Sequence, residues 1–316
     1  MERAELLQET RSLLVSAGFV VSESFEMRLA GFDIVARRGE TLLIIKVLSN
    51  IDTFSEPVAR SLRQLALMLK ATPLLIGEKN GFNSLEQNVV YDRFGIQAIT
   101  LEALSGHLLE DVPLWAHAGP GGFYVNLDAE RIRRLRQEKN ISLGEFARFV
   151  RVSRRTVQMY EDGMSARVDV AARIEEFLET PVITPIDLWK SMPEESMSLE
   201  AGLEQMKAFQ REVLTLLHRV GYKIVPMDRC PFEAVSKERD QILLTCIQEY
   251  NKHLRKKAEV LANLSRITEK QAVVFLDREI ARRNLAGTPI IMKRDLKKIR
   301  DPEDISLMIS ERTDEQ

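Results

Sequence analysis

The sequence predicts an α+β protein in which two copies of a mixed α/β unit flank a smaller all-α unit. Two observations support this: the order of apolar segments near the start of the 316-residue chain returns after residue 200, and short capped helices fill the middle. With 45% apolar and 29% charged residues, the chain can bury several cores. The predicted units are residues 1–112, 128–179 and 201–301, with linkers at 113–127 and 180–200 and a tail at 302–316.

The repeat is defined by matched segments in the same order. Each copy begins with a helix that ends at a glycine, Gly18 or Gly221, where a left-handed cap fits. Strands, a helix and further strands follow. The matched segments are 31–35 with 231–235, 40–46 with 240–246, 57–69 with 253–267, 73–76 with 272–276 and 95–104 with 287–296. Matched residues of the two copies are 203 positions apart at Gly18 and 192 positions apart at Gly95. Small insertions in loops account for this change, so duplication is favoured over chance similarity.

Glycine and proline clusters mark the two linkers. The first contains Gly119-Pro120-Gly121-Gly122, and a short strand is predicted to follow at 123–125. The second contains Pro181, Pro185 and Pro193.

Short helices are predicted between these linkers. Asp128, Ser142 and Ser153 are suitable N-cap residues, and Glu145 would complete a capping box with Ser142. Only a tight turn at Arg151 joins the second helix to the third, which is typical of a helix-turn-helix. The predicted helices are 129–139, 143–150, 154–162 and 169–178. The apolar side chains expected where the second and third helices cross are Phe146, Ala147, Val150, Val152, Val157 and Tyr160.

Residues 142–163 resemble the lambda-repressor-like (Xre-type) helix-turn-helix family, whose usual Glu-x-Gly ending is here Glu161-Asp162-Gly163. Leu143 stands where that family usually has Gln. Arg151 stands where it usually has Gly, so a left-handed conformation is expected there. Glu161 is expected to be an internal ion-pair or cap partner rather than a functional group.

The resemblance implies binding of double-stranded DNA, with the third helix in the major groove. Because Val157 and Tyr160 would face the core, the opposite face of that helix would approach base edges. The side chains expected at base edges are Ser153, Arg154, Arg155, Gln158 and Met159. Those expected at phosphates are Ser142, Arg136 and Arg151.

Local charge favours this interpretation over a helical bundle with a solvated basic face. The whole chain has 45 Lys and Arg against 47 Asp and Glu, a formal net charge of -2. Residues 131–155 alone hold nine basic and two acidic residues, a net charge of +7. A local basic surface on a nearly neutral protein limits indiscriminate binding.

The flanking units resemble the PD-(D/E)XK nuclease family and its Holliday-junction-resolvase branch, which implies a restriction-endonuclease-like fold. Those enzymes use two acids and a Lys around a divalent metal. Asp33 and Lys46 stand in two of these places, but Ile44 stands at the second acid, and the second copy keeps only Glu233. We therefore expect Asp33, Lys46 and Glu233 to form a degenerate site without metal or catalysis, even with Glu5 or Glu9 available on the first helix.

The full arrangement resembles an archaeal family of helix-turn-helix transcriptional regulators, which implies binding of double-stranded DNA with transcriptional control. The helix-turn-helix motif class further implies a homodimer. One alternative is a structure-directed DNA binder, or a residual metal-dependent nuclease, that uses the flanking units. Another is a protein-binding adaptor or chromatin scaffold. Basic runs at 252–257 and 293–300 could contact duplex backbone or be solvated helix faces.

Other classes of function are disfavoured. The 2 cysteines, Cys230 and Cys246, are too few for a disulfide framework, and no two of the 4 histidines have a metal-ligand spacing. No cofactor is predicted, and no effector ligand is indicated. Apolar stretches fall far short of the ~18 residues of a membrane span. The charged start also lacks a signal-peptide pattern, so a cytoplasmic location is expected.

Overall fold

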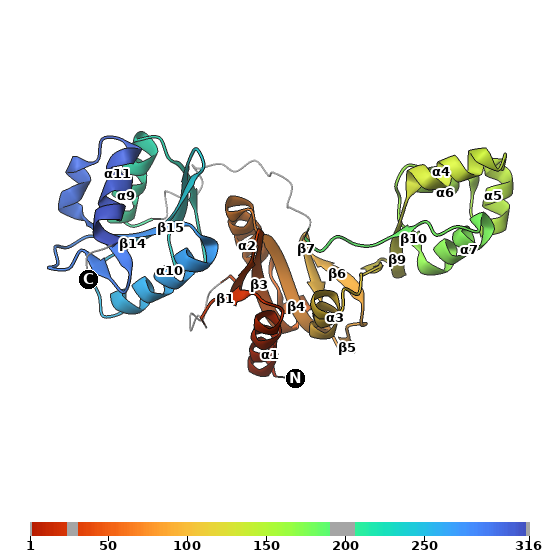
Figure 1. The fold of residues 1–316 in the computed structure, drawn as a ribbon, viewed down its shortest axis with the longest axis horizontal. Coiled ribbons are helices and arrows are strands. Elements are labelled where there is room, and N and C mark those ends of the chain that lie inside the picture. Colours follow the sequence, from red (N-terminus) through yellow and green to blue (C-terminus); the bar gives the residue numbers. More distant parts are fainter. Residues whose placement is uncertain (1, 24–30, 190–205, 314–316) are drawn as a thin grey trace. The chain divides into compact units, whose positions relative to one another are not determined.

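The computed structural model describes residues 2–23, 31–189 and 206–313 (Figure 1). The chain divides into two compact units. The first comprises residues 1–6, 48–53 and 75–190, and the second comprises residues 7–47, 54–74 and 191–316. The last part of the predicted second linker, including Pro193, lies outside the described residues.

Residues up to 109 have the predicted mixture of helices and strands. The elements are α1 (Arg3–Ser16), β1 (Val20–Val21), β2 (Ile34–Arg38), β3 (Thr41–Asn50), η1 (Ile51–Thr53), α2 (Glu56–Leu69), β4 (Thr72–Asn80), β5 (Asn83–Ser84), β6 (Val89–Arg93), β7 (Ile96–Ile99) and α3 (Leu101–Leu109). In the second unit β1, β2 and β3 are adjacent and antiparallel, with Ile34 opposite Ile45. In the first unit the order is β4-β7-β6. Gly18, with φ 81, follows α1 as predicted.

Residues 113–127 are not the expected linker. They form a hairpin of β8 (Ala116–Gly119) and β9 (Gly122–Leu127), and β8 pairs in parallel with β6. The predicted strand at 123–125 lies within β9. The glycines and proline make the hairpin turn, where Gly121 has φ 79, rather than a boundary between domains.

Four helices follow, at the predicted positions to within one residue. They are α4 (Ala129–Glu138), α5 (Leu143–Val150), α6 (Arg154–Glu161) and α7 (Val168–Leu178). The predicted caps are confirmed: Asp128, Ser142 and Ser153 each accept a hydrogen bond from the backbone N–H three residues on, at 2.9, 3.1 and 3.0 Å.

This part of the chain is not all-α as expected, because strands join its core. Both β10 (Ala166–Arg167) and β11 (Ile183–Thr184) pair with β9. Val125 and Leu127 of β9, and Val182 just before β11, are buried with Phe146 and Ile174 of the helices. The β6, β8 and β9 pairings therefore connect the helices to the preceding sheet through backbone hydrogen bonds rather than a flexible tether.

Residues 206–313 form another mixed sheet with helices. The elements are α9 (Ala208–Arg219), β12 (Lys223–Pro226), β13 (Ala234–Glu238), β14 (Gln241–Gln248), α10 (Leu254–Thr268), β15 (Gln271–Leu276), β16 (Asn284–Leu285), β17 (Thr288–Met292), η2 (Lys293–Lys298) and α11 (Pro302–Thr313). The strand order is β12-β13-β14-β15-β17-β16, and β14, β15 and β17 are parallel. The helix predicted to follow β17 is the 3-10 helix η2.

The expected tail, residues 302–316, is also corrected, since its described part is helix α11. Ile305 and Ile309 are 0% and 4% exposed and pack into the core of this sheet. Charged and polar residues surround the apolar ones in this segment, which is why its two core isoleucines gave a weak signal in the sequence.

A buried ion pair anchors α11 to η2 and predicts a pH dependence. Asp295 Oδ2 lies 3.0 Å from Arg312 Nη2, and both side chains are 5–6% exposed. Burial acts to raise the pKa of Asp295, but the Arg312 charge and the Met292 N–H outweigh it, so this pKa is lowered. A lowered carboxyl pKa stabilises the fold above about pH 4, and the contribution is lost as pH falls through the folded pKa. The protection factors of the α11 amides, which correct exchange for the intrinsic rate at each pH, should therefore fall on acidification more steeply in the native protein than in Asp295→Asn.

Candidate nucleic-acid interface

The turn between α5 and α6 fixes how the two helices cross. Arg151 has φ 59 and ψ 46, the left-handed conformation predicted for it, at a cost of roughly 1–2 kcal/mol. The following N–H, of Val152, donates to Ala147 O at 2.9 Å. Phe146 and Val157 are both 0% exposed beneath the crossing. The two helices thus form one packed unit with a defined outer surface.

The outer surface of α6 carries the side chains predicted to read bases. Val157 and Tyr160 are buried, whereas Arg154, Arg155 and Gln158 are exposed and Met159 is 42% exposed. The Ser153 hydroxyl accepts from Thr156 N at 3.0 Å and lies 2.8 Å from Thr156 Oγ1, so capping occupies part of its bonding capacity.

Arg136 is engaged inside the domain and is not free to contact phosphate as expected. Its side chain is 14% exposed, and its Nε and Nη2 donate to the two carboxylate oxygens of Glu161 at 2.5 and 3.0 Å. A third bond runs to Ile141 O at 3.1 Å. The hydrogen bond to Glu161 raises the pKa of Arg136, against the effect of burial. The predicted internal ion-pair role of Glu161 is confirmed.

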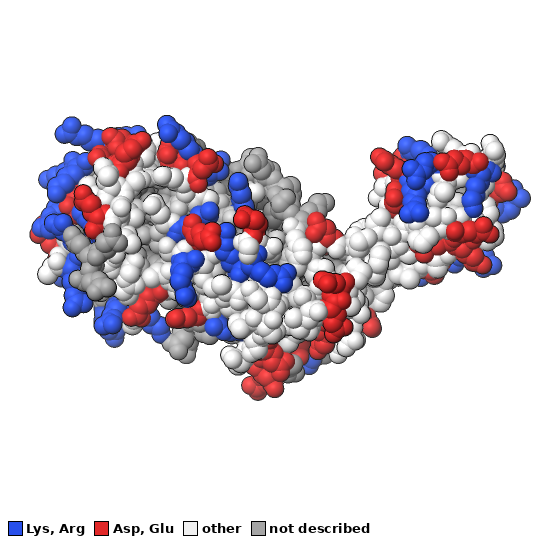
Figure 2. All heavy atoms as spheres, in the orientation of Figure 1, with Lys and Arg blue, Asp and Glu red and all other residues white. Residues whose placement is uncertain are grey.

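Ion pairs within the domain leave only some of the positive charges of residues 131–155 available to bind DNA. Four of its nine basic residues have an acidic partner: Arg133, Arg134, Arg136 and Lys139. Within the described part of the chain no acid pairs with the other five, which are Arg131, Arg148, Arg151, Arg154 and Arg155. Figure 2 shows basic and acidic atoms interspersed on the visible face of the body that carries α4–α7. Three of the five available arginines therefore belong to the α5–α6 turn and the start of α6.

Sequence reasoning missed a contact between the starts of α5 and α6. The Arg154 guanidinium lies so close over Gly144 that a Cβ at residue 144 would stand 3.0 Å from Nε and from Nη2. Gly144 is in the first turn of α5, beside Leu143. The only sequence signal was a glycine within a short helix, where it is unfavourable.

The predicted nuclease-like residues form a structural pair. Lys46 Nζ lies 3.3 Å from Asp33 Oδ1, and Val47 N–H donates to Asp33 Oδ2 at 2.8 Å. The position of the second acid is occupied by the fully buried Ile44, which has no carboxylate, and Glu5 and Glu9 are exposed on α1. Among the described residues no group of three or more His, Cys, Asp or Glu could hold a metal ion. The residues present do not fit a two-acid metal site.

Residues 206–313 contain a similar pair that the sequence only half predicted. Ile247 N–H donates to Glu233 Oε2 at 2.6 Å, as Val47 does to Asp33. The lysine comes instead from α10: Lys257 Nζ lies 2.7 Å from Glu233 Oε1. Burial acts to lower the pKa of Lys257, but Cys246 and Glu233 outweigh it and raise the pKa. Lys257 therefore stays charged as the partner of Glu233.

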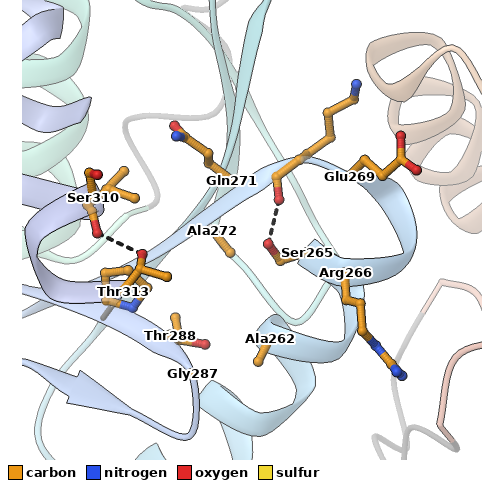
Figure 3. A pocket seen from close by; sticks show the side chains of 13 residues that line it. Ala262, Ser265, Arg266, Glu269, Gln271, Ala272, Gly287, Thr288, Ser310 and Thr313 are labelled. Atoms are coloured by element: carbon orange, nitrogen blue, oxygen red, sulfur yellow. Dashed lines mark hydrogen bonds between the residues drawn. The ribbon is translucent and has the colours of Figure 1, made fainter. Parts of the chain in front are cut away.

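Residues 206–313 contain two cysteines and an open surface hollow, and neither feature forms a reactive or ligand-binding site. Burial raises the pKa of Cys230 to about 12, so this thiol stays protonated at neutral pH. A hollow of about 480 Å³ lies beside the ends of α10 and α11. Figure 3 shows the side chains that line it. The hydroxyls of Ser265, Thr288 and Thr313 bond to backbone carbonyls at 2.6, 2.8 and 2.7 Å, and Arg266 extends away from the hollow.

Comparisons with known proteins agree with this description. Two capped helices around a tight turn define a helix-turn-helix protein. Residues 132–183 match the family model described as helix-turn-helix, and residues 3–114 match that described as PD-(D/E)XK superfamily domain. No solved structure matches the chain. No helix of the described residues has the length and apolar character needed to span a membrane.

Archaeal relatives match along nearly the whole chain. One from Methanocella arvoryzae is 34% identical over 308 residues, covering 96% of this chain and 95% of the relative. One from Natronomonas pharaonis is 34% identical over 317 residues, covering 99% and 100%. One from Methanospirillum hungatei is 36% identical over 319 residues, covering 98% and 99%. Each is named "Putative HTH-type transcriptional regulatory protein". The chain belongs to this family.

Proposed function

We propose that the protein is a sequence-specific, double-stranded-DNA-binding transcriptional regulator that reads the major groove with α6. The observation that carries this proposal is the exposure of Arg154, Arg155, Gln158 and Met159 on one face of α6 while Val157 and Tyr160 pack beneath it. Arginine can donate two bonds to guanine, glutamine can pair with adenine, and an apolar side chain can contact a thymine methyl.

Backbone contacts come from the residues around the turn. Arg151 is exposed and has no acidic partner within the described residues, so it can neutralise a phosphate. Ser142 and Ser153 stand at the first turns of α5 and α6, where hydroxyl groups can approach the DNA backbone. Arg136 is left out of this set because Glu161 holds it.

The protein acts as a homodimer in this proposal and performs no catalysis. Two copies of α6 related by a two-fold axis would contact half-sites ~34–36 Å apart.

Residues 206–313 are a second copy of the PD-(D/E)XK-like fold. Their strand order, β12-β13-β14 followed by β15-β17-β16, repeats the order β1-β2-β3 and β4-β7-β6 of the first copy. A cytoplasmic location, with access to the chromosome, goes with this function.

Selection from random DNA duplexes tests the proposal. The full-length protein should enrich one motif that is an inverted repeat with half-sites about 10–10.5 bp apart. The double variant Arg155→Ala, Gln158→Ala is the control, and it should lose the motif while retaining weak salt-sensitive binding. Failure of the native protein to enrich any motif would refute sequence reading.

A second candidate function is recognition of DNA structure by the PD-(D/E)XK-like parts. The family-model match over residues 3–114 and the retained Asp33–Lys46 pair favour it. Branched and linear duplexes of equal sequence, compared for affinity, separate it from sequence reading. Incubation of both substrates with Mg²⁺ or Mn²⁺ should leave them intact. Cleavage that Asp33→Ala abolishes would establish a nuclease.

A further inference from the structure

We infer that Gly144 is a positioning residue. Because it has no side chain, it leaves the space in which the Arg154 guanidinium lies, and there the guanidinium can contact DNA. This inference rests on the proposed function and adds to it a residue that makes no DNA contact of its own. Gly144 lies in the first turn of α5, and Arg154 is the first residue of α6. A Cβ at residue 144 would be 3.0 Å from Nε and from Nη2 and 3.2 Å from Cζ, closer than ordinary van der Waals contact, so the guanidinium would have to shift from its present place.

The conflict falls on the flexible end of a side chain rather than on the backbone. The nearest atoms to the added Cβ all belong to the Arg154 guanidinium. The helices can therefore keep their positions while the arginine moves away. Alanine is also a better helix former than glycine, by about 0.8–1.0 kcal/mol. Nothing in the local geometry favours glycine at this position except the space that it leaves for Arg154.

The arginine held there is available for a ligand. Within the described part of the chain its guanidinium has no acid and no carbonyl as a partner. Arg136 differs, since its nitrogen atoms are engaged by Glu161 and Ile141. Because the Arg154 guanidinium lies over the open face of Gly144 and is exposed, it can bind a ligand without first giving up an internal ion pair. The matching ligand group presents two acceptors side by side, as the guanine O6 and N7 atoms or two phosphate oxygens do.

The test is a double-substitution cycle on the full-length protein, with affinity measured for the selected duplex. Gly144→Ala should lower affinity about 2- to 10-fold, the range for reordering one side chain. It should also leave thermal stability unchanged or raise it. In an Arg154→Ala background, adding Gly144→Ala should change affinity by less than 2-fold. Gly106→Ala is the matched control: Gly106 lies in α3, where an added Cβ would make only ordinary contact with Val112 at 3.7 Å.

Repeating the measurements on duplexes with each half-site position changed identifies the acceptor. If Arg154 reads guanine, Gly144→Ala weakens preference at one position. If it holds a phosphate, Gly144→Ala lowers affinity evenly for all sequences. Either pattern supports the positioning role. Unchanged affinity in Gly144→Ala, or an equal loss in the Arg154→Ala background, overturns it. Full affinity in Arg154→Ala alone would show that Arg154 does not contact DNA, and it would overturn the positioning role of Gly144 as well.

Discussion

Replacing Glu161 by Ala is expected to destabilise the helix-turn-helix domain by about 3–5 kcal/mol, because it leaves the Arg136 charge enclosed without an acid partner. The Glu161 side chain is 5% exposed and that of Arg136 is 14% exposed. The same carboxylate also lies 3.7 Å from Arg133 Nε. Domains are typically stable by only about 5–15 kcal/mol, so a loss of this size should open the helices in a measurable fraction of molecules.

Residue-resolved hydrogen exchange on the full-length protein measures this effect without requiring unfolding of the whole chain. Amides of α4, α5 and α6 should lose protection in Glu161→Ala, while those of β14 and β15 keep theirs. Asp162→Ala is the matched control, because it removes the 69% exposed acid that pairs with Arg133 at 2.7 Å. Its effect should stay within about 0.5 kcal/mol. Native-like protection in Glu161→Ala would mean that the pair contributes nothing to stability.

The parts of the fold that the sequence predicted well depend on local rules. Ser142 and Ser153 accept the backbone bonds that their positions indicated, and Arg151 has the left-handed conformation expected of a residue in a glycine position. Such features depend on a few neighbouring residues, which a single sequence contains. The apolar spacing of α6 likewise separated the buried Val157 and Tyr160 from the exposed face.

The features that the sequence did not predict depend on partners distant along the chain. β8 forms because it pairs in parallel with the edge strand β6, which lies about 27 residues earlier in the chain, with Val89 opposite Ala116. Lys257 reaches Glu233 from another element, and no local pattern connects them. Arg136 was assigned to phosphate by its charge alone, although Glu161, 25 residues away, holds it. Position in the sequence shows that a side chain is basic, but only tertiary structure shows which acids neutralise it.

Replacing Arg155 by Ala is expected to weaken binding to the selected duplex by about 1–3 kcal/mol and to abolish preference at one base position. Arg155 is exposed in the first turn of α6, and no acid pairs with it among the described residues. Its guanidinium can therefore reach a base edge without first breaking an ion pair. Gln158, one turn further along α6, should have an effect of similar size at a neighbouring position.

Two further variants distinguish base reading by Arg155 from simple attraction of a positive charge. Arg155→Lys keeps the charge but loses the planar pair of donors, so it should lose base preference while keeping most of the salt-dependent affinity. Arg134→Ala removes a 67% exposed arginine of α4 that pairs with Glu138, and it should leave base preference intact. Titrations against duplexes that differ at single positions, each at several salt concentrations, measure both quantities. If Arg155→Ala instead lowers affinity evenly for all duplexes and leaves base preference intact, the contact of Arg155 is with phosphate, because a phosphate contact carries no sequence information.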